Sequence, residues 1–310
     1  MTQLRKAGAG RGRSGSPTPA PSSGRPFTAR SVVASTLLGV EPPRLPTRLL
    51  VRSGELFGIS PGTTRVAISR MVAAGELVVD GDAHRLAGRL LERQARQQAS
   101  RSPRRRRWGG EWILAVVTET RRPVAARAEL RAAMSVLRRA EWREGVWLRP
   151  DNLDESWAGP AQAVVAAQCH QFVGRPESFD GSADAGFAGA PADHLDPTSA
   201  TGRPDDPSAE LAARLWDLDA WAGRAVELRG QVGHLAPRLD DGDTAALAPA
   251  FVLSADVLRH LLADPLLPPE LLAPDWPGDG LRSDYDRYDQ AFRAVWRTWY
   301  HSQEPSRQPR

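Results

Sequence analysis

Residues 45–86 read LPTRLLVRSGELFGISPGTTRVAISRMVAAGELVVDGDAHRL, and this stretch decides the fold of the N-terminal part of the chain. Its pattern predicts two helices, a tight turn and two short strands. We expect Thr47 to cap the first helix and Gly58 to end it, because glycine accepts the left-handed backbone common at helix C-termini. Ser60 and Pro61 are typical of a helix start, which leaves a turn of about three residues, as in a helix-turn-helix.

The second predicted helix has an apolar face and a polar face. Residues spaced i, i+3, i+4 and i+7 form its buried side, and these are Thr64, Ala67, Ile68 and Met71. The outward side carries Thr63 at its flank, Arg65, Val66, Ser69 and Arg70. Arginine can bridge guanine acceptors in a major groove, and hydroxyls reach phosphate oxygens. We predict that this face contacts DNA; taken alone, its two arginines fit a solvated surface equally well.

Two short strands follow the second helix. Residues 77–79 and 84–86 flank a turn at residues 80–83, and such a hairpin is typical of a wing beside a recognition helix. Arg85 lies in the second of these strands and is a further predicted DNA contact.

The charge of the chain is strongly divided. Up to Arg107 there are 20 lysines and arginines against 6 aspartates and glutamates, a net charge of +14. The remaining residues carry 21 basic side chains against 31 acidic ones, a net charge of −10, so the whole-chain value of +4 conceals the division. A basic part beside an acidic part is typical of a DNA footprint in a protein whose other half has another task, and it favours DNA contact over a merely solvated face.

Length and composition restrict the class of protein further. The 310 residues leave room for two or three domains. No apolar run approaches the roughly 18 residues of a membrane span, and the N-terminal residues lack a hydrophobic signal core. The single cysteine, Cys169, excludes an internal disulfide and a multi-cysteine metal site. We expect a cytoplasmic, nucleoid-associated protein.

Composition shifts indicate the domain boundaries in the first third of the chain. Residues 1–28 are rich in Gly, Ser, Pro and Arg and predict a disordered basic tail. Residues 29–92 contain the predicted winged-helix DNA-binding domain. Residues 93–107 are predicted to be a basic linker. Within it, the arginine run at 104–107 is expected to be solvated, with a contact to the DNA backbone or to an acidic neighbouring surface as alternatives.

A central domain is predicted over residues 108–173. Its expected strands and helix lie at 112–117 (strand), 124–140 (helix), 145–149 (strand) and 163–167 (strand). This pattern predicts a small α+β layer.

The rest of the chain is predicted to be helical after a break. Residues 174–207 are too poor in apolar side chains to fold and predict a flexible insertion. Residues 208–310 predict a helical C-terminal domain. One helix is expected to start at residue 208, and two more are expected at residues 244–262 and 281–300. The last helix has an aromatic stripe, Tyr285, Tyr288, Phe292, Val295, Trp296 and Trp299. We interpret the stripe as core, with a dimer contact as the alternative.

Short motifs follow one another in a specific order along the chain. They are GIS at 58–60, TRVAISRM at 64–71, Gly75, WGGEW at 108–112, GVWLRP at 145–150, LWDL at 215–218, DP at 264–265, LL at 271–272 and DWPG at 275–278. In this order and spacing, the chain resembles the PaaX-type transcriptional repressors of phenylacetate catabolism from about residue 29 to residue 296, apart from the insertion.

The resemblance implies an α+β multidomain protein with an N-terminal winged helix-turn-helix, a central ferredoxin-like α+β domain and a helical C-terminal domain. It also implies a homodimer that represses a catabolic operon through an inverted-repeat operator in double-stranded DNA. An aryl-acetyl-CoA thioester, with phenylacetyl-CoA as the candidate, would act as the effector that releases the protein from DNA. Carried over residue by residue, the recognition helix of the family corresponds to Thr63, Arg65, Val66, Ser69 and Arg70.

The chain departs from that family in several places. Asp80 and Asp82 stand in the wing where such proteins usually carry basic residues, and His84 stands where a tyrosine or another ring is expected. The insertion and the arginine-rich tail are additional. These departures affect the assignment of phenylacetyl-CoA more than the assignment of a regulator.

Enzyme hypotheses have weaker support in the sequence. Ser254, Asp256 and His260 fall on one predicted helix without a nucleophile elbow, and so do not form a hydrolase triad. A nuclease-like central domain would need a carboxylate at the end of its first strand, where Glu119 comes one residue late. We predict a non-enzyme without cofactor or metal, and keep a nucleic-acid-processing enzyme and a non-specific DNA binder as alternatives.

No effector-binding residue is predicted from the sequence. An aryl-CoA needs an apolar slot for its ring and arginines for its pyrophosphate. Candidates by residue type alone are Trp112, Trp147, Trp216, Trp221, Trp276 and Arg149. Most tryptophans in a chain with ten of them are expected to be core.

Overall fold

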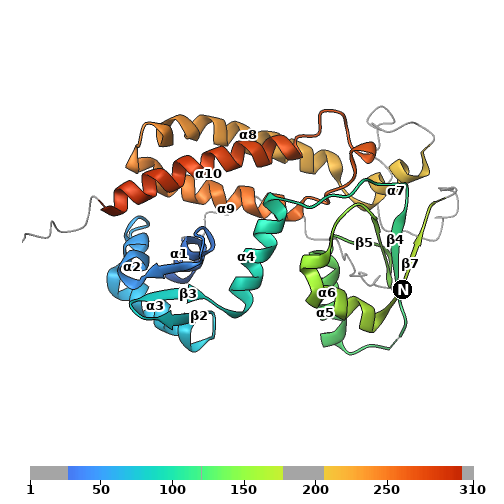
Figure 1. Cartoon of the computed structure of the whole chain (residues 1–310), viewed down its shortest axis with the longest axis horizontal. Helices are drawn as coiled ribbons and strands as arrows, with labels where there is room; N and C mark the ends of the chain where they lie inside the picture. Colours follow the sequence, from blue (N-terminus) through green and yellow to red (C-terminus); the bar gives the residue numbers. More distant parts are fainter. Residues whose placement is uncertain (1–26, 120, 177–205, 302–310) are drawn as a thin grey trace, which may run out of the picture.

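The computed structural model describes residues 27–119, 121–176 and 206–301. The tail predicted over residues 1–28 and the insertion predicted over residues 174–207 lie almost entirely outside the described residues. Figure 1 shows an N-terminal unit, a central sheet with its helices, and a group of long C-terminal helices that lies across both. The chain is therefore a mixed α+β protein with a helical C-terminal part, as predicted.

The N-terminal unit consists of helices packed on a small sheet. Its elements are α1 (Ala29–Leu38), β1 (Arg44–Pro46), α2 (Thr47–Glu55), α3 (Pro61–Ala73), β2 (Leu77–Asp80) and β3 (Ala83–Leu86). The strands form an antiparallel sheet in the order β1-β3-β2. Val33 and Leu37 of α1 share a buried core with Leu50 of α2 and with Ile68 and Met71 of α3.

Local chemistry explains where α3 begins. Ser60 Oγ accepts a hydrogen bond from the backbone N–H of Thr63, and Pro61 occupies the first turn, as predicted. Gly58, which precedes this cap, has a φ of 69°, the left-handed value that favours glycine. The short turn between α2 and α3 is thus encoded by the residues within it.

The prediction that Thr47 caps α2 is wrong. The capping position is Pro46, which makes no side-chain hydrogen bond there. The Thr47 hydroxyl instead donates to the carbonyl of Asp82, 2.9 Å away, and lies 3.1 Å from Nδ1 of His84. Thr47 therefore ties the start of α2 to the β2–β3 hairpin.

Helix α4 (Gly88–Arg101) leads out of the N-terminal unit. The predicted linker begins inside this helix, because residues 93–101 continue it without a break. At its end, the Arg101 guanidinium contacts Asp286 and Asp289 of the last helix, with N–O distances of 2.6 and 2.9 Å. Figure 1 shows α4 rising between the two sheet-containing units to the C-terminal helices.

The arginine run at 104–107 is not simply solvated, contrary to our first expectation. Arg105 makes two hydrogen bonds to the Asp279 carboxylate, of 2.8 and 2.9 Å. Arg106 contacts Asp151 at 2.6 Å. The alternative of an acidic neighbouring surface is therefore correct, and this surface belongs to the chain itself.

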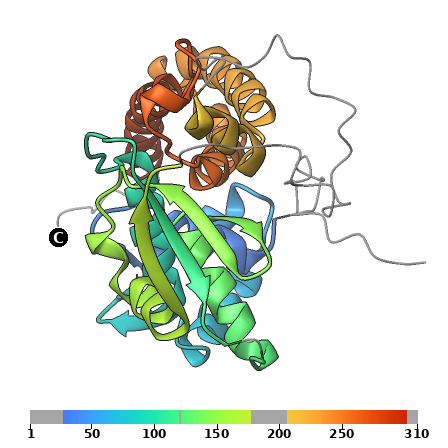
Figure 2. The same ribbon diagram turned by 90° about the vertical axis from the view of Figure 1, so that its right-hand side faces the viewer.

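The central unit is an antiparallel sheet in the order β5-β6-β4-β7. Its elements are β4 (Trp112–Val117), α5 (Val124–Val136), β5 (Ala140–Arg143), β6 (Val146–Pro150), η1 (Ser156–Ala158), α6 (Gly159–Gln168) and β7 (Cys169–Gly174). Ala115 of β4 is buried with residues of α5 and α6, whereas Trp112 of the same strand is buried with Leu211 and Leu271 from the C-terminal part. The two faces of the sheet are thus covered by different parts of the chain. Figure 2 shows the strands side by side below the C-terminal helices.

The strand predicted at residues 163–167 is wrong, because this segment lies in α6. Ala161 and Val165 are buried four residues apart, which is helical spacing, and they pack against α5. The strand begins only at Cys169. Burial raises the pKa of the Cys169 thiol, and the next side chain along the strand, His170, is exposed.

The C-terminal part is helical, as predicted. Its elements are α7 (Pro207–Leu215), α8 (Leu218–Asp240), η4 (Thr244–Ala246), α9 (Leu247–Ala263), η5 (Pro269–Leu271) and α10 (Gly278–His301). The helix predicted to start at residue 208 is divided into α7 and α8. The second helix begins anew because the Asp217 side chain caps it by accepting a hydrogen bond from the Ala220 N–H. Helices α8, α9 and α10 share one core, which includes Tyr285, Tyr288 and Trp296. The interpretation of these aromatic residues as core is confirmed.

One helical stretch, Thr244–Ala263, is long and apolar enough to cross a membrane by length and composition. The expectation that no apolar run approaches this length is therefore wrong. Val257 and Leu261 of this stretch are fully buried in the core with α8 and α10. The core helix of a soluble protein passes the same test, so the stretch is weak evidence for a membrane span.

A buried polar cluster joins the three parts of the chain. Arg282 of α10 donates to the Asp264 carboxylate at 2.6 Å and to the Ser100 carbonyl at 3.0 Å. Arg138, which follows α5, donates to the Ser100 hydroxyl at 2.8 Å and to the backbone carbonyls of Asp264 and Leu262. Burial lowers the pKa of Arg138 to about 10. This cluster fixes α4, the central unit and α10 relative to one another.

Candidate nucleic-acid interface

The outward side of α3 carries every recognition-helix residue predicted from the sequence. Within this helix the side chains of Thr64, Ile68 and Met71 are buried. The predicted contacts are solvent-exposed, and these are Thr63, Arg65, Val66, Ser69 and Arg70. Val66 is 51% exposed, although valine side chains are usually buried in a protein core. The helix therefore presents a mixed basic and apolar surface to solvent.

The arginines of this surface differ from most others in the chain. Within the described residues, Arg65, Arg70 and Arg85 make no hydrogen bond or ion pair. By contrast, Arg101, Arg105 and others at the unit boundaries contact carboxylates at 3 Å or less. A guanidinium without a protein partner keeps its donors for another acceptor, such as a base edge or a phosphate.

The start of α3 presents hydroxyl groups beside these arginines. The Thr63 and Ser60 hydroxyl oxygens lie 2.9 Å apart, so the cap and the flank of the recognition face are linked. No acidic residue lies in the first turn of α3. The N-terminal end of a helix carries a partial positive charge that favours anions. Both features suit an approach by phosphate oxygens.

The two aspartates of the β2–β3 hairpin, Asp80 and Asp82, form ion pairs with a nearby arginine. Arg44 of β1 contacts the Asp80 carboxylate at 2.8 Å and the Asp82 carboxylate at 3.9 Å. Strand register places Arg44 opposite Arg85 on the neighbouring strand. The two acids, which looked unfavourable for phosphate in the sequence, therefore have a cationic partner in the same sheet.

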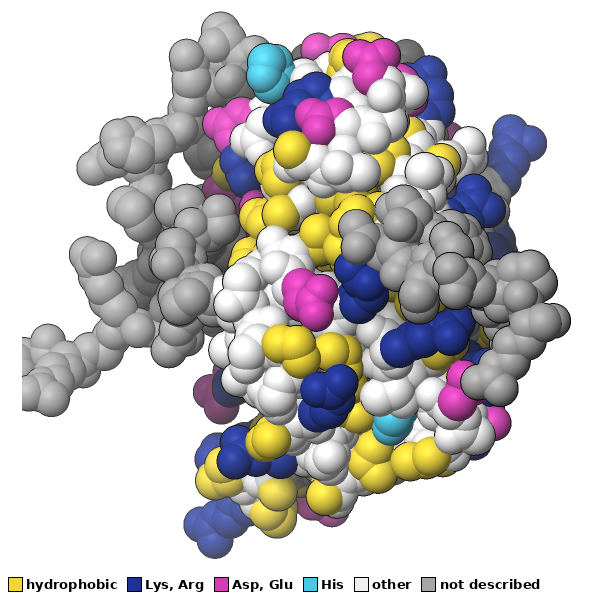
Figure 3. Space-filling view, turned by 90° about the vertical axis from the view of Figure 1, so that its left-hand side faces the viewer, with side chains coloured by type: hydrophobic (Ala, Val, Ile, Leu, Met, Phe, Trp, Pro, Cys, Tyr) yellow, Lys and Arg dark blue, Asp and Glu magenta, His cyan; other side chains and the backbone are white. Residues whose placement is uncertain are grey.

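The surface that carries these residues is seen in Figure 3. Arginine side chains lie over the lower half of this view, which is formed by the N-terminal unit, and they alternate with hydrophobic ones. Acidic and basic side chains are mixed in the upper part, over the ends of the C-terminal helices.

The N-terminal unit rests on the C-terminal helices. Phe57, which follows α2, contacts Phe27, which precedes α1, with ring centroids 5.1 Å apart. Its ring centroid also lies 5.0 Å from that of Phe251 in α9. The Tyr300 hydroxyl of α10 donates to the carbonyl of Leu49 in α2. Leu49 and Phe57 thus pack on the C-terminal core rather than on the core of their own unit. Leu50, the neighbour of Leu49 in α2, belongs to the N-terminal core instead.

The residues considered for hydrolysis are engaged elsewhere. Asp256 contacts Arg259 at 2.7 Å. His260 Nε2 lies 3.0 Å from the Trp221 carbonyl, and its ring stacks on the Trp221 indole. Ser254, Asp256 and His260 lie on one helix, as predicted. The contacts of Asp256 and His260 do not connect them to Ser254 as a proton relay would require. Glu119 is exposed, and the described residues contain no group of three or more potential metal ligands.

The ligand candidates chosen by residue type have structural roles. Arg149 is fully buried and donates to the carbonyls of Leu137 and Pro150 and to Oδ1 of Asn152. Burial lowers the pKa of Arg149 to about 9. Trp221 stacks between His260 and Trp276 in the C-terminal part.

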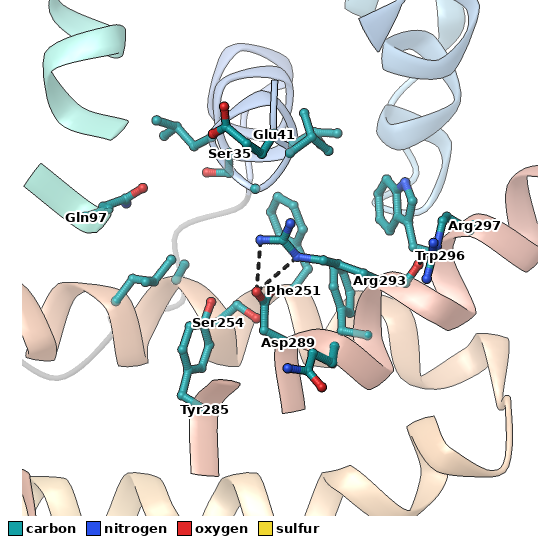
Figure 4. A pocket seen from close by; sticks show the side chains of 18 of the residues that line it. Ser35, Glu41, Gln97, Phe251, Ser254, Tyr285, Asp289, Arg293, Trp296 and Arg297 are labelled. Atoms are coloured by element: carbon teal, nitrogen blue, oxygen red, sulfur yellow. Dashed lines mark hydrogen bonds and ion pairs between the residues drawn. The ribbon is translucent and has the colours of Figure 1, made fainter. Parts of the chain in front are cut away.

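A cavity of about 410 Å³ lies between the N-terminal unit and the C-terminal helices, and residues of α1, α4, α9 and α10 line it. The sequence gives no indication of this cavity. Figure 4 shows Ser35 and Glu41 on one side, Phe251 and Ser254 on another, and the Arg293 guanidinium directed at Asp289. Because the lining residues are up to 262 positions apart, from Ser35 to Arg297, no local pattern could have revealed them.

Comparisons with known proteins agree with this geometry. Residues 28–93 match the family model described as PaaX-like protein, and residues 216–301 match the model of the PaaX-like protein C-terminal domain. A solved structure of an uncharacterized protein, Rv0674 from Mycobacterium tuberculosis, is 37% identical, with a TM-score of 0.61. The match covers 87% of this chain and 98% of that one. Among curated proteins, no relative matches the chain.

The N-terminal unit, which carries the exposed arginines of α3, rests on the helical C-terminal part. The family matches cover both of these parts. The chain belongs to the PaaX-like family of transcription regulators.

Proposed function

We propose that this protein is a cytoplasmic repressor that binds an inverted-repeat operator as a homodimer. In this proposal it controls a catabolic operon for phenylacetate or a related aromatic acid, and an aryl-acetyl-CoA or related CoA thioester releases it from DNA. The observation that carries the proposal is the exposed face of α3, where Arg65 and Arg70 are without protein partners in the described part of the chain. The family assignment supports the catabolic role.

The N-terminal unit is proposed to be a winged helix-turn-helix. The element order α1-β1-α2-α3-β2-β3 and the three-stranded sheet support this. In such a domain the second helix of the pair enters the major groove and the hairpin lies beside it. Arg65, Val66, Ser69 and Arg70 would then face base edges, while Thr63 and Arg85 would contact the backbone.

The central unit is proposed to be a ferredoxin-like domain. Its elements follow the order β-α-β-β-α-β, and the sheet order β5-β6-β4-β7 places the first and third strands in the middle. This element and strand order is that of a ferredoxin-like fold.

Binding of the protein to the promoter DNA of its own gene tests the proposal. Full-length protein is titrated against that fragment and against random DNA of equal length, with fluorescence anisotropy as the readout. We expect operator binding to be lost in the double variant R65A/R70A, with circular dichroism unchanged. Arg131→Ala, which removes an exposed charge from α5, is the control and should bind as the wild type does.

The alternatives give distinct outcomes. Equal affinity for promoter and random DNA would contradict a specific regulator and favour a non-specific binder. Turnover of nucleic acid with Mg²⁺ would favour an enzyme. Two-fold symmetry predicts half-sites about one helical turn, roughly 10 base pairs, apart, so a footprint on a single half-site would contradict the dimer.

A further inference from the structure

The cavity between the N-terminal unit and the C-terminal helices has an apolar interior. Phe251 and Leu258 of α9 and Phe292 and Trp296 of α10 contribute their side chains to its wall. Its volume of about 410 Å³ lies within the range of small-molecule sites, which is roughly 300–1,000 Å³. A ring or short acyl group therefore fits inside by size and by chemistry.

The lining of this cavity has more positive charge than its carboxylates balance. The lining contains Arg93, Arg293 and Arg297 together with Glu41 and Asp289. Asp289 is already shared between Arg293 and Arg101, each with an N–O distance of 2.9 Å. Arg93 makes no hydrogen bond or ion pair with any residue that the structure describes.

The surroundings of Arg93 reinforce this imbalance. Partial burial and then the guanidinium groups of Arg259, Arg96 and Arg30 lower the pKa of Arg93, whose side chain is still exposed to solvent; the described groups that act on it include no carboxylate. Arg297 lies on the other side of the cavity from Gln97 of α4 (Figure 4). An anion beside α4 would relieve the repulsion around Arg93 and supply acceptors for its donors.

We infer that this cavity is a binding site for a small molecule with an apolar ring or acyl group inside and an anionic group held by Arg93 of α4. A free aromatic carboxylate and an acyl-CoA thioester share this chemistry. The effect of such a ligand on DNA rests on the proposed function, whereas its binding to the cavity does not.

The position of the cavity explains how an occupant could reach the DNA-binding face. Ser35 and Leu38 of α1 line the cavity. On the opposite side of the same helix, Val33 and Leu37 are buried against α3 through Ile68. A ligand that separates α1 from α10 would therefore move the helix that supports the recognition helix, and would shift the population between two orientations of the N-terminal unit.

Binding of three probes to the full-length protein without DNA tests the site. The probes are phenylacetate, phenylacetyl-CoA and CoA alone, and the readouts are calorimetry and tryptophan fluorescence, since Trp296 lines the cavity. We expect one or both phenylacetyl probes to bind and CoA alone to bind more weakly. Binding of phenylacetate alone would identify the free acid as the ligand, and binding of the thioester alone would identify the acyl-CoA.

Variants then place the ligand in the cavity. Arg93→Ala should weaken binding by about tenfold, and Ala255→Phe, which fills the apolar interior, should abolish it. Arg131→Ala should bind as the wild type does, and thermal unfolding identifies any variant that is not folded. Unchanged affinity in both cavity variants, or no binding of any probe at about 1 mM, would overturn the inference.

The DNA-binding variant separates the two proposals. R65A/R70A should retain full ligand affinity, because Arg65 and Arg70 lie on the exposed side of α3 and neither lines the cavity. If the ligand binds the cavity but operator affinity does not change, the inference about the site stands and the proposed effector response fails. If R65A/R70A loses ligand binding along with DNA binding, the assignment of the ligand to the cavity is wrong.

Discussion

Gly54 of α2 lies so close to Thr64 of α3 that a Cβ added at Gly54 would be 2.4 Å from the Thr64 hydroxyl oxygen. Thr64 is fully buried, and its hydroxyl donates to the Ser60 carbonyl at 3.2 Å. The hydroxyl therefore has little room to move away. This contact sets the distance between the two helices of the helix pair, and so the position of the exposed side of α3.

Gly54→Ala should destabilise the protein by about 1–3 kcal/mol, because the added methyl group overpacks the contact between α2 and α3. Gly233→Ala is the matched control, since a Cβ at Gly233 in α8 meets nothing within 4 Å. There, alanine should stabilise the helix by up to about 1 kcal/mol. Urea unfolding of both variants measures the difference, and a Gly54→Ala protein as stable as the wild type would contradict the close contact.

Arg44→Ala should weaken DNA binding severalfold, because it leaves Asp80 and Asp82 without their cation near the phosphates. Removing the acid as well should restore affinity, so Arg44→Ala/Asp80→Asn is the control. The pair is exposed on both sides, and its loss should change thermal stability little. Anisotropy titration at two salt concentrations measures the effect; equal affinity of Arg44→Ala and wild type would mean that the hairpin does not approach DNA.

Asp264→Ala should be among the most damaging single substitutions, with a loss of about 3–5 kcal/mol in the free energy of unfolding. It removes the buried carboxylate from the Arg282 guanidinium, which is 7% exposed, and leaves only the exposed Asp279 carboxylate at 3.5 Å among the described residues. Arg287→Ala, which breaks an ion pair on the surface of α10, should cost less than about 1 kcal/mol. Chemical unfolding compares the two, and similar losses would show that the buried cluster does not hold the three parts together.

The stability of the protein should fall as the pH decreases below about 6.5. Burial lowers the pKa of His260 in the folded protein, so the folded state favours the neutral ring. His260 therefore contributes stability that is present above the unfolded pKa of about 6.5 and is lost as the pH falls through the folded pKa. Burial also lowers the pKa of His84, which adds an effect of the same sign.

His260→Gln should reduce this pH dependence while its amide can still donate to the Trp221 carbonyl. His170→Gln, at an exposed position of β7, is the control. Thermal unfolding between pH 5 and pH 8 provides the measurement. A His260→Gln protein with the same slope as the wild type would exclude His260 as a source of the effect.

Sequence predicts those parts of the fold whose causes are local. The start of α3 follows from Ser60 and Pro61, and its buried side follows from the spacing of Thr64, Ile68 and Met71. The error at residues 163–167 has a physical reason: a run of alanine and valine suits either a strand or a helix, and burial against α5 selects the helix.

The remaining features depend on contacts between distant residues. The role of Arg105 rests on Asp279, 174 positions away, and neither residue reveals the other locally. The cavity combines the end of α1 with α4, α9 and α10 in the same way. For the candidate interface, sequence identifies the exposed residues of α3, whereas the contact of Asp80 with Arg44 requires the strand pairing.

Helix α10 is continuous from Gly278 to His301, so its 24 residues span about 36 Å. Near its start Arg282 is anchored in the buried cluster, and near its end Tyr300 holds α2. Such a helix acts as a lever arm. A tilt of about 5° around its first turn would displace its far end by about 3 Å, close to the roughly 3.4 Å rise of one base pair. On the proposed function, a tilt of this size that starts beside the cavity, midway along α10, would move α2 and with it take α3 out of register with a DNA groove.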